Sequence, residues 1–222
     1  MDQFIDQFFN LDVMRQTLPM ILHGLWVAFL LCLVVIPAGF IGGLFVALGS
    51  LSKHRSLRWS SVVFTDFFRA IPPLVLLIFV YSGLPFLGLR LNPMVAVIIA
   101  FFLNNAAYYG EVHRAGICSV HKGQMEAALA TGLRKRHALI YIILPQAIRN
   151  VLPDLLSNTI EVIKLTSLAS VVSLAEILYA ANMARSVTYN ASPLVLAALV
   201  YLVFILPLVR LVRRFDKRTV QS

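Results

Sequence analysis

Residues 122–145 read KGQMEAALATGLRKRHALIYIILP, and this stretch decides how the chain is organised. Its first part predicts a short amphipathic helix over 123–133, because apolar side chains recur at positions i, i+3 and i+4. These side chains are Met125, Ala128 and Leu129. Gly132 stands where such a helix would end, since glycine adopts a left-handed backbone at little cost. Pro145 then opens or kinks the helix that follows.

The composition of the whole chain indicates a bilayer protein. Of its 222 residues, 59% are hydrophobic and 13% are charged, whereas soluble domains are about half apolar and about a quarter charged. The mean hydropathy is +0.84. So few charged residues cannot cover a water-facing surface, which excludes a soluble enzyme, a disordered tail and a secreted disulfide scaffold. Cys32 and Cys118 form no disulfide framework, and we expect both to be packing residues.

Five apolar runs approach or exceed the length of about 20 residues that a membrane span requires. They cover residues 18–51, 61–87, 93–109, 155–178 and 194–212. We therefore expect an all-α membrane protein with one transmembrane domain over 18–215, an N-terminal segment over 1–17 and a C-terminal tail over 216–222. The first run is too long for a straight span and contains Pro19 and Pro37, which predicts a tilted or kinked helix.

Basic residues alternate from one connecting segment to the next, and this alternation predicts the orientation. Segments 52–60 and 111–138 hold three and five Lys or Arg residues, and residues 213–222 hold four. One such residue occurs in each of the remaining segments, which are 1–17, 84–92 and 179–193. The positive-inside rule then places the N-terminus outside and the C-terminus in the cytoplasm. The net charge of +9 is attributed to topology and to contacts with anionic membrane lipid, not to nucleic acid.

The spacing within the opening stretch resembles a known signature. Glu126-Ala127-Ala128, three residues, Gly132, nine residues and then Ile142-x-Leu144-Pro145 match the pattern EAA-x3-G-x9-I-x-LP of ABC importer permeases. The stretches AAYYGEVHRAGICSVHKGQMEAALATG (106–132) and FFRAIPPLVLLIF (67–79) are similar to the polar amino-acid subfamily of these permeases. The resemblance covers about residues 18–215.

This resemblance implies a type I ABC importer permease fold in a bacterial inner membrane, with five spans, a periplasmic N-terminus and a cytoplasmic C-terminus. Two such subunits, identical or homologous, would form the translocation path, and a periplasmic binding protein would deliver a polar amino acid. The segment at about 122–137 would hold a cytoplasmic coupling helix that docks on a separate ATPase subunit. Its coupling residues would be Glu126, Ala127, Ala128 and Gly132. On amphipathicity alone, a helix lying on the lipid surface is the alternative.

No phosphate-binding pattern G-x4-GK-[ST] occurs in the sequence. We therefore expect no enzyme activity and no cofactor in this chain, with ATP and Mg²⁺ bound by the partner ATPase. The five histidines have no ligand-like spacing, so we expect no metal site.

Two ionisable residues, Glu161 and Lys164, lie inside the fourth apolar run at positions i and i+3 of one helix face. A charge inside a span is costly, which makes it a functional candidate. Glu161 would accept the ammonium group of an amino acid, and Lys164 would pair with its carboxylate. Further side chains expected along the path are Thr166, Ser167 and Asn105. The alternative is that Glu161 and Lys164 only pair with each other to lower their own cost of burial.

Leu165 stands where some relatives carry an acidic residue, which weakens the case for a cationic solute. Two other pairs suggest structural roles: Asp66 with Arg69 as an ion pair, and Glu111 with Arg114 as a brace at the membrane edge.

Small and amide side chains predict helix contacts. Gly39 and Gly43 form a G-x3-G pair, which is typical of closely packed helices, with a subunit interface as the less favoured alternative. Asn104, like Asn105, could hydrogen-bond between helices or line the path.

Two other classes of function stay open at this point. The first is a secondary transporter or channel that uses Glu161 and Lys164 without ATP. The second is a non-transport assembly subunit of a membrane complex.

Overall fold

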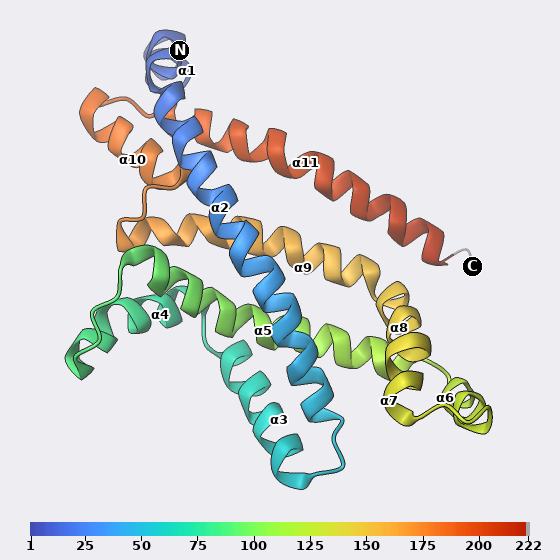
Figure 1. Cartoon of the computed structure of the whole chain (residues 1–222). Helices are drawn as coiled ribbons and strands as arrows, with labels where there is room; N and C mark the ends of the chain where they lie inside the picture. The colour runs from blue at the N-terminus through green and yellow to red at the C-terminus, as the bar shows by residue number, and fades with distance from the viewer. Residues whose placement is uncertain (221–222) are drawn as a thin grey trace. The chain divides into compact units, whose positions relative to one another are not determined.

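The computed structural model describes the backbone of residues 1–220 and the side chains of residues 1–212. The described part of the chain is helical, without β-strands (Figure 1). Its α-helices are α1 (Asp2–Phe9), α2 (Leu11–Ser50), α3 (Arg55–Ala70), α4 (Pro73–Ile78), α5 (Pro93–Ser119), α6 (Lys122–Ala130), α7 (Lys135–Ala138), α8 (Leu144–Asn150), α9 (Leu152–Leu165), α10 (Ile177–Thr188) and α11 (Ser192–Val220). Two π-helical turns, η1 (Phe79–Gly83) and η3 (Leu139–Ile143), and two 3₁₀ turns, η2 (Leu84–Leu87) and η4 (Thr166–Val172), complete the order.

The chain forms two compact units, and α2, α5 and α9 each contribute to both. Unit 1 comprises Met1–Ile36, Pro72–Phe101 and Ile160–Arg210. Unit 2 comprises Pro37–Ile71, Phe102–Thr159 and the chain from Leu211 onward. The tail predicted over 216–222 and its basic side chains lie outside the described side chains.

Four segments of the described chain are long and apolar enough to cross a membrane: Asp2–Ser50, Pro93–Ser119, Leu152–Val172 and Ser192–Val212. A fifth candidate is the pair Arg55–Ala70 and Pro73–Leu87, which is bent by 101°. The predicted all-helical membrane architecture is confirmed, with five spans when the bent pair counts as one. The second apolar run, 61–87, is therefore not one straight helix. Ile71 and Pro72 are extended, with ψ of 127° and 133°, because a residue before proline is driven out of the helical region.

Several predicted boundaries also differ from the structure. The first run is one unbroken helix, α2, which passes through both prolines. The third run begins at Pro93 as expected but continues to Ser119, so the polar residues after Tyr109 are still helical. The fourth run ends early, because Ser173 adopts a left-handed backbone with φ of 59°. Part of the segment predicted as the next connector is α10.

Unit 1 is held together by apolar packing between α2, α10 and α11. Its buried cluster contains Ile21, Ala28, Ile177, Ala180, Ala181 and Ala197. Gly24 makes the approach of α2 possible, since a Cβ at this position would lie 2.7 Å from the backbone carbonyl of Glu176. Small residues let helix backbones come close without a hydrophobic driving force from water.

Unit 2 packs the second half of α2 against α5 through glycines. A Cβ at Gly39 would lie 2.9 Å from the Cβ of Asn105, and one at Gly43 would lie 2.6 Å from the Cβ of Tyr109. The predicted helix contact of the G-x3-G pair is therefore confirmed, and it is made within this chain. His113 adds a polar contact, with Nε2 3.2 Å from the backbone oxygen of Phe40.

Candidate functional site

At both ends of helix α6, backbone groups form hydrogen bonds with neighbouring residues of the same segment. At its start, Nδ1 of His121 accepts from the backbone N–H of Gly123 at 3.1 Å. At its end, Gly132 is left-handed with φ of +85° and donates to the carbonyl of Leu129, while Leu133 donates to the carbonyl of Ala128. This pair of bonds is the Schellman motif, in which a left-handed residue closes a helix. The helix-ending role predicted for Gly132 is confirmed, although the helix itself ends at Ala130 and not at residue 133.

The candidate coupling residues lie on α6 and on the turn that ends it, and they differ in exposure. Glu126 and Ala127 are exposed, whereas Ala128 is buried, with an exposed fraction of 4%. Leu129 is 44% exposed and Met125 is half-buried, so of the three residues of the predicted apolar face only Ala128 is buried against the chain. The four candidate residues thus lie on one short helix and its C-terminal turn.

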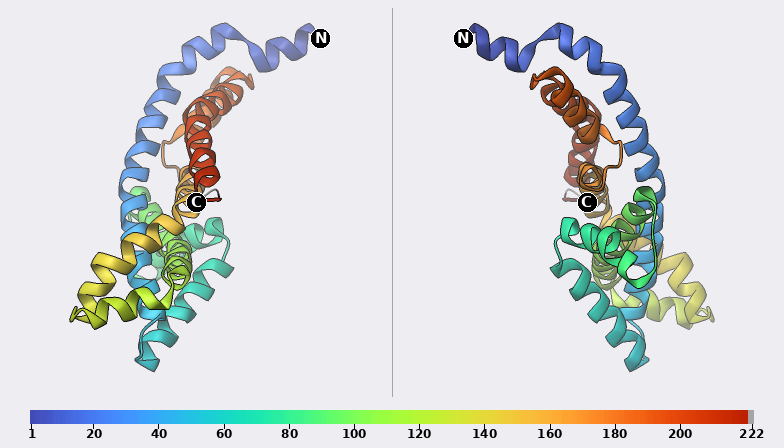
Figure 2. Two further views of the ribbon diagram at one scale, coloured as in Figure 1. Left: turned by 90° about the vertical axis from the view of Figure 1, so that its right-hand side faces the viewer. Right: turned by 90° about the vertical axis from the view of Figure 1, so that its left-hand side faces the viewer.

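The segment from α6 to α8 projects from the end of α5 (Figure 2). It is anchored at two points. A Cβ at Gly116 of α5 would lie 2.8 Å from the carbonyl oxygen of Ala147, so α5 and α8 are in backbone contact. Nδ2 of Asn150 also donates to Oγ of Ser119 at 2.8 Å. The projecting segment is therefore firmly attached to a membrane-spanning helix.

Pro145 lies in the first turn of α8, directly after the π-helical turn η3. A proline lacks the N–H that an α-helix requires, and a wider turn accommodates that loss. The prediction that this proline opens a new helical segment is confirmed.

Glu161 and Lys164 lie on α9 of unit 1 and form an ion pair of 2.6 Å. Both side chains are exposed, at 62% for Glu161 and 51% for Lys164. The alternative in which Glu161 and Lys164 pair with each other is therefore present in the structure. The pair is not buried, however, so a cost of burial does not explain it. Ser167 follows on the same face and donates to the carbonyl of Lys164 at 2.8 Å.

Two other residues predicted to line the path are buried. The Thr166 hydroxyl, 1% exposed, donates to the carbonyl of Ile163. Asn105, also 1% exposed, lies in unit 2 beside Gly39. The structure does not place either side chain on an exposed surface. The neighbouring Asn104 donates to the carbonyl of Phe68 at 3.1 Å and satisfies a backbone acceptor at the end of α3.

The prediction of an Asp66–Arg69 ion pair is wrong. Among the described residues the ion pairs are Glu161–Lys164 and Glu111–Arg114, and the guanidinium of Arg69 instead lies 5.4 Å from the ring centre of Tyr108. A guanidinium over an aromatic face is stabilised by the ring quadrupole. Arg69 makes this contact with the ring of Tyr108 on α5 in place of the predicted ion pair with Asp66.

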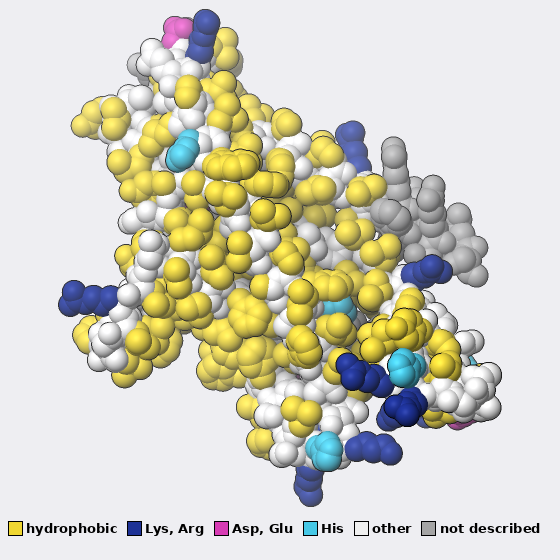
Figure 3. Space-filling model, viewed as in Figure 1, with side chains coloured by type: hydrophobic (Ala, Val, Ile, Leu, Met, Phe, Trp, Pro, Cys, Tyr) yellow, Lys and Arg dark blue, Asp and Glu magenta, His cyan; other side chains and the backbone are white. Residues whose placement is uncertain are grey.

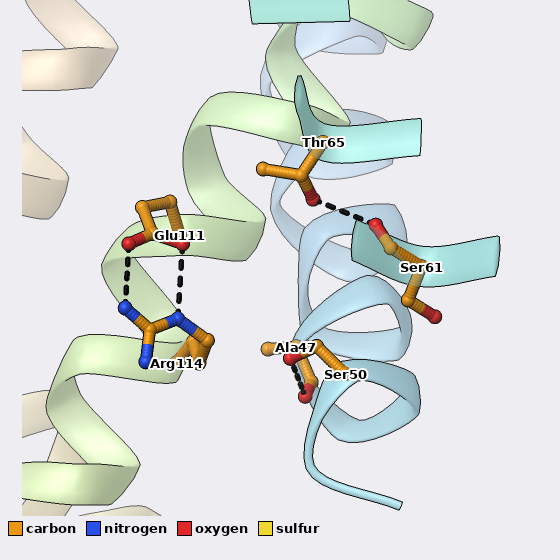
Figure 4. A network of polar contacts seen from close by, with 6 residues as sticks. All are labelled: Ala47, Ser50, Ser61, Thr65, Glu111 and Arg114. Carbon is orange, nitrogen blue, oxygen red and sulfur yellow. Dashed lines mark hydrogen bonds and ion pairs between the residues drawn. The ribbon is translucent and has the colours of Figure 1, made fainter. Parts of the chain in front are cut away.

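The brace predicted for Glu111 and Arg114 is confirmed (Figure 4). Nε and Nη2 of Arg114 lie 3.0 and 2.6 Å from the two carboxylate oxygens of Glu111. Such a two-pronged contact is among the stronger polar contacts in proteins.

A groove in unit 1 opens beside Lys164. Its volume is about 460 Å³, and it runs along one face of α11. The lining residues are Lys164, Ser167, Ala198, Tyr201, Leu202, Ile205, Leu206 and Val209. Apart from Lys164 and Ser167 of the α9–η4 segment, every one of them comes from α11.

Sequence reasoning missed Glu176, which is fully buried. Its carboxylate accepts from the backbone N–H groups of Leu178 and Tyr179, both at 2.8 Å, and so caps α10. It also accepts from the hydroxyl of Tyr201 at 3.1 Å. Burial raises the pKa of this carboxyl above its ordinary value, although the hydrogen bonds it accepts act in the opposite direction. The sequence feature that could have identified Glu176 is its position as an acidic residue at the end of an apolar run.

No cluster of three or more His, Cys, Asp or Glu side chains suited to a metal occurs within the part of the chain that the structure describes.

Residues 39–221 match the family model described as "Binding-protein-dependent transport system inner membrane component". The chain belongs to this family. The permease is 36% identical over 197 residues to the probable amino-acid ABC transporter permease protein YckA of Bacillus subtilis (strain 168), covering 88% of this chain and 87% of the relative. It is 33% identical over 214 residues to the probable glutamine ABC transporter permease protein GlnM of the same organism, covering 96% and 99%.

Solved structures agree with this membership. The permease superposes on a chain from the crystal structure of an amino acid ABC transporter with histidines, with a TM-score of 0.84, 32% identity, and coverage of 92% of this chain and 96% of that one. A chain of the MetNI methionine ABC transporter shares the fold, with a TM-score of 0.75 at 16% identity and coverage of 90% and 96%.

The protein is therefore a permease subunit of an ABC importer, an inner-membrane protein that is not itself catalytic. ATP hydrolysis takes place on a separate subunit, and the family works with ATPase, permease and solute-binding partners in general. The alternatives of a secondary transporter, a channel or an assembly subunit are not supported by this membership.

Proposed function

We propose that the permease imports a polar amino acid that it receives from a periplasmic binding protein, with a second permease subunit, identical or homologous, completing the path. The names of relatives support the solute class: they include permeases for glutamine and for arginine. The N-terminus would be periplasmic and the C-terminus cytoplasmic. This orientation is supported by the Lys and Arg side chains around α3 and the α6–α7 segment, which both belong to unit 2 (Figure 3).

The exposure of Glu126, Ala127 and Gly132 supports a coupling role for α6 and the turn that ends it, in which the buried Ala128 would pack the helix against the rest of the chain. A short helix that projects from the membrane domain is suited to a groove on another protein. The α6–α8 segment is attached to α5 through α8, by Asn150 and by the contact of Ala147 with Gly116, and this attachment would transmit a rigid-body movement to the spans. ATP and Mg²⁺ would be bound by the ATPase partner and not by this chain.

The observation that carries the proposed solute path is the exposed Glu161–Lys164 pair on a membrane-spanning helix. Charges exposed to lipid would be costly, so such a pair faces a water-filled cavity or another subunit. A zwitterion offers each partner a replacement, since its ammonium group pairs with Glu161 and its carboxylate with Lys164. Ser167 adds a hydroxyl on the same face. Thr166 and Asn105, which are buried, would contact solute only after the helices move.

Uptake by proteoliposomes that contain the permease, its ATPase and its binding protein tests this path. Glu161→Gln with Lys164→Met should abolish ATP-driven amino-acid uptake while the complex still assembles. The Glu111–Arg114 pair is a matched control, because it has the same i, i+3 spacing and the same 2.6 Å separation. Glu111→Gln with Arg114→Met should leave solute affinity unchanged. Full uptake by the Glu161/Lys164 variant would refute the proposed path.

A further inference from the structure

The groove beside Lys164 is lined by polar side chains from the α9–η4 segment and by mostly apolar side chains from α11. Lys164 is its single charged lining residue, and Ser167 lies next to it on the same segment. The face contributed by α11 is aliphatic except for Tyr201. The hydroxyl of Tyr201 is engaged by Glu176, so that residue offers the groove a ring whose position is fixed. The side of the groove that the α9–η4 segment lines is therefore polar, and the side that α11 lines is mostly apolar.

The charged lining residue of the groove belongs to the proposed amino-acid site. Oε1 of Glu161 lies 2.6 Å from Nζ of Lys164, so both charges needed for the backbone of an amino acid are present beside the groove. The side chain of the same amino acid starts one bond from the two charged groups. With the backbone at this pair, the side chain can extend into the adjoining groove.

The geometry points to this groove as the side-chain subsite of the permease, which takes a polar amino acid whose side chain is uncharged and has an aliphatic stem. The inference rests on the proposed function of Glu161 and Lys164. No carboxylate lines the groove, so a cationic side chain would be buried without a partner, which is costly. An anionic side chain would leave the aliphatic wall unfilled and would compete for Lys164. A volume of about 460 Å³ leaves room for a long side chain.

Binding to the purified permease–ATPase complex in lipid nanodiscs, without the binding protein, tests this selectivity directly. Radiolabelled glutamine should bind, whereas arginine and glutamate should bind at least about tenfold more weakly, as expected for an unpaired charge in an apolar site. Arginine that binds as tightly as glutamine would overturn the proposal.

Ala198 offers a way to fill the groove, because it is exposed and lines the wall. Ala198→Phe should weaken glutamine binding by about tenfold or more, and Ala198→Leu should weaken it less. Val203→Phe is the matched control, since Val203 is exposed on α11 but does not line the groove. If Ala198→Phe fails to assemble, the milder Ala198→Leu variant decides.

Three outcomes separate this inference from the proposed function. Loss of glutamine binding in the Ala198 variants, with the Val203 control unchanged, supports the subsite. Unchanged glutamine affinity in the Ala198 variants, together with lost binding in Lys164→Met, overturns the subsite alone and leaves the groove to a lipid chain or a helix of the second permease. Binding of every amino acid by Lys164→Met overturns the proposed path and the subsite together.

Discussion

The hydroxyl of Tyr201 donates a 3.1 Å hydrogen bond to the carboxylate of Glu176, a residue with no exposed surface. The same carboxylate caps α10 through the backbone N–H groups of Leu178 and Tyr179. Gly24 of α2 packs against the backbone of Glu176. Glu176 is therefore the point in unit 1 at which α2, α10 and α11 are joined.

Replacement of Glu176 by alanine should destabilise the permease more than any change to its phenolic partner. Glu176→Ala removes a helix cap and leaves buried donors without an acceptor, at a cost of about 2–4 kcal/mol. Tyr201→Phe removes one hydrogen bond and should cost about 1 kcal/mol. Thermal unfolding in detergent compares the two variants. Equal losses would show that the cap contributes nothing.

The stability of the permease should also depend on pH through Glu176. Burial raises the pKa of this carboxyl from its ordinary value of 4.5, so the folded state binds the proton more tightly than the unfolded state. The contribution of Glu176 to the free energy of unfolding is fully present below pH 4.5, and it is lost as the pH rises through the raised pKa of the folded state. Glu176→Gln does not titrate and should flatten this part of the profile. A wild type that gains stability relative to Glu176→Gln over the same rise in pH would contradict this.

The sequence indicated the apolar spans and the end of α6 because both depend on local patterns. Gly132 closes its helix through its own backbone freedom, and the motif spacing is local as well. The role of Glu176 depends on Tyr201, 25 residues away, and no local pattern encodes that partner. The contact of Arg69 with Tyr108 was missed for the same reason, since sequence spacing favoured Asp66.

Gly132→Ala should uncouple the transporter at a modest cost in stability. The residue has φ of +85°, and a Cβ added here would have no atom within 4 Å, so the penalty comes from the backbone alone, about 1–2 kcal/mol. Gly88→Ala is a close control, because Gly88 has φ of +81° in equally open space but lies outside α6. Both variants should lose similar stability, and only Gly132→Ala should lose ATP-driven uptake. Equal uptake by the two variants would argue against a special role for the end of α6.

The glycine contact between α2 and α5 should tolerate no added methyl group. A Cβ at Gly43 would lie 2.6 Å from the Cβ of Tyr109 and 2.7 Å from the backbone nitrogen of Gly110. Gly43→Ala should therefore cost about 1–3 kcal/mol. At Gly83 the nearest atom would be a ring carbon of Phe79 at an ordinary 3.5 Å, so Gly83→Ala should be close to neutral. Thermal unfolding compares the stability of the two variants. Equal stability of Gly43→Ala and Gly83→Ala would contradict a close contact between α2 and α5 at Gly43.

The bend at Pro72 and the division of the fourth apolar run show that an apolar pattern does not predict where a helix bends or ends. Hydropathy reports that a segment is apolar, but the course of the backbone depends on single residues such as Pro72 and Ser173. The groove was likewise not predictable, because it requires α11 to lie beside the end of α9. The exposed ion pair was predictable, since both charges lie on one helix face.

Cross-linking from α6 to the ATPase subunit is the decisive test of the coupling role. Cys32 and Cys118 are first replaced by serine, and Ala130→Cys, an exposed position at the end of α6, is labelled with a photoactivatable maleimide. Gln3→Cys in α1 is the control on the opposite side of the membrane in the proposed orientation. We predict an adduct with the ATPase from residue 130 and none from residue 3. No adduct from residue 130 in a complex that still performs ATP-driven uptake would contradict a coupling role for α6.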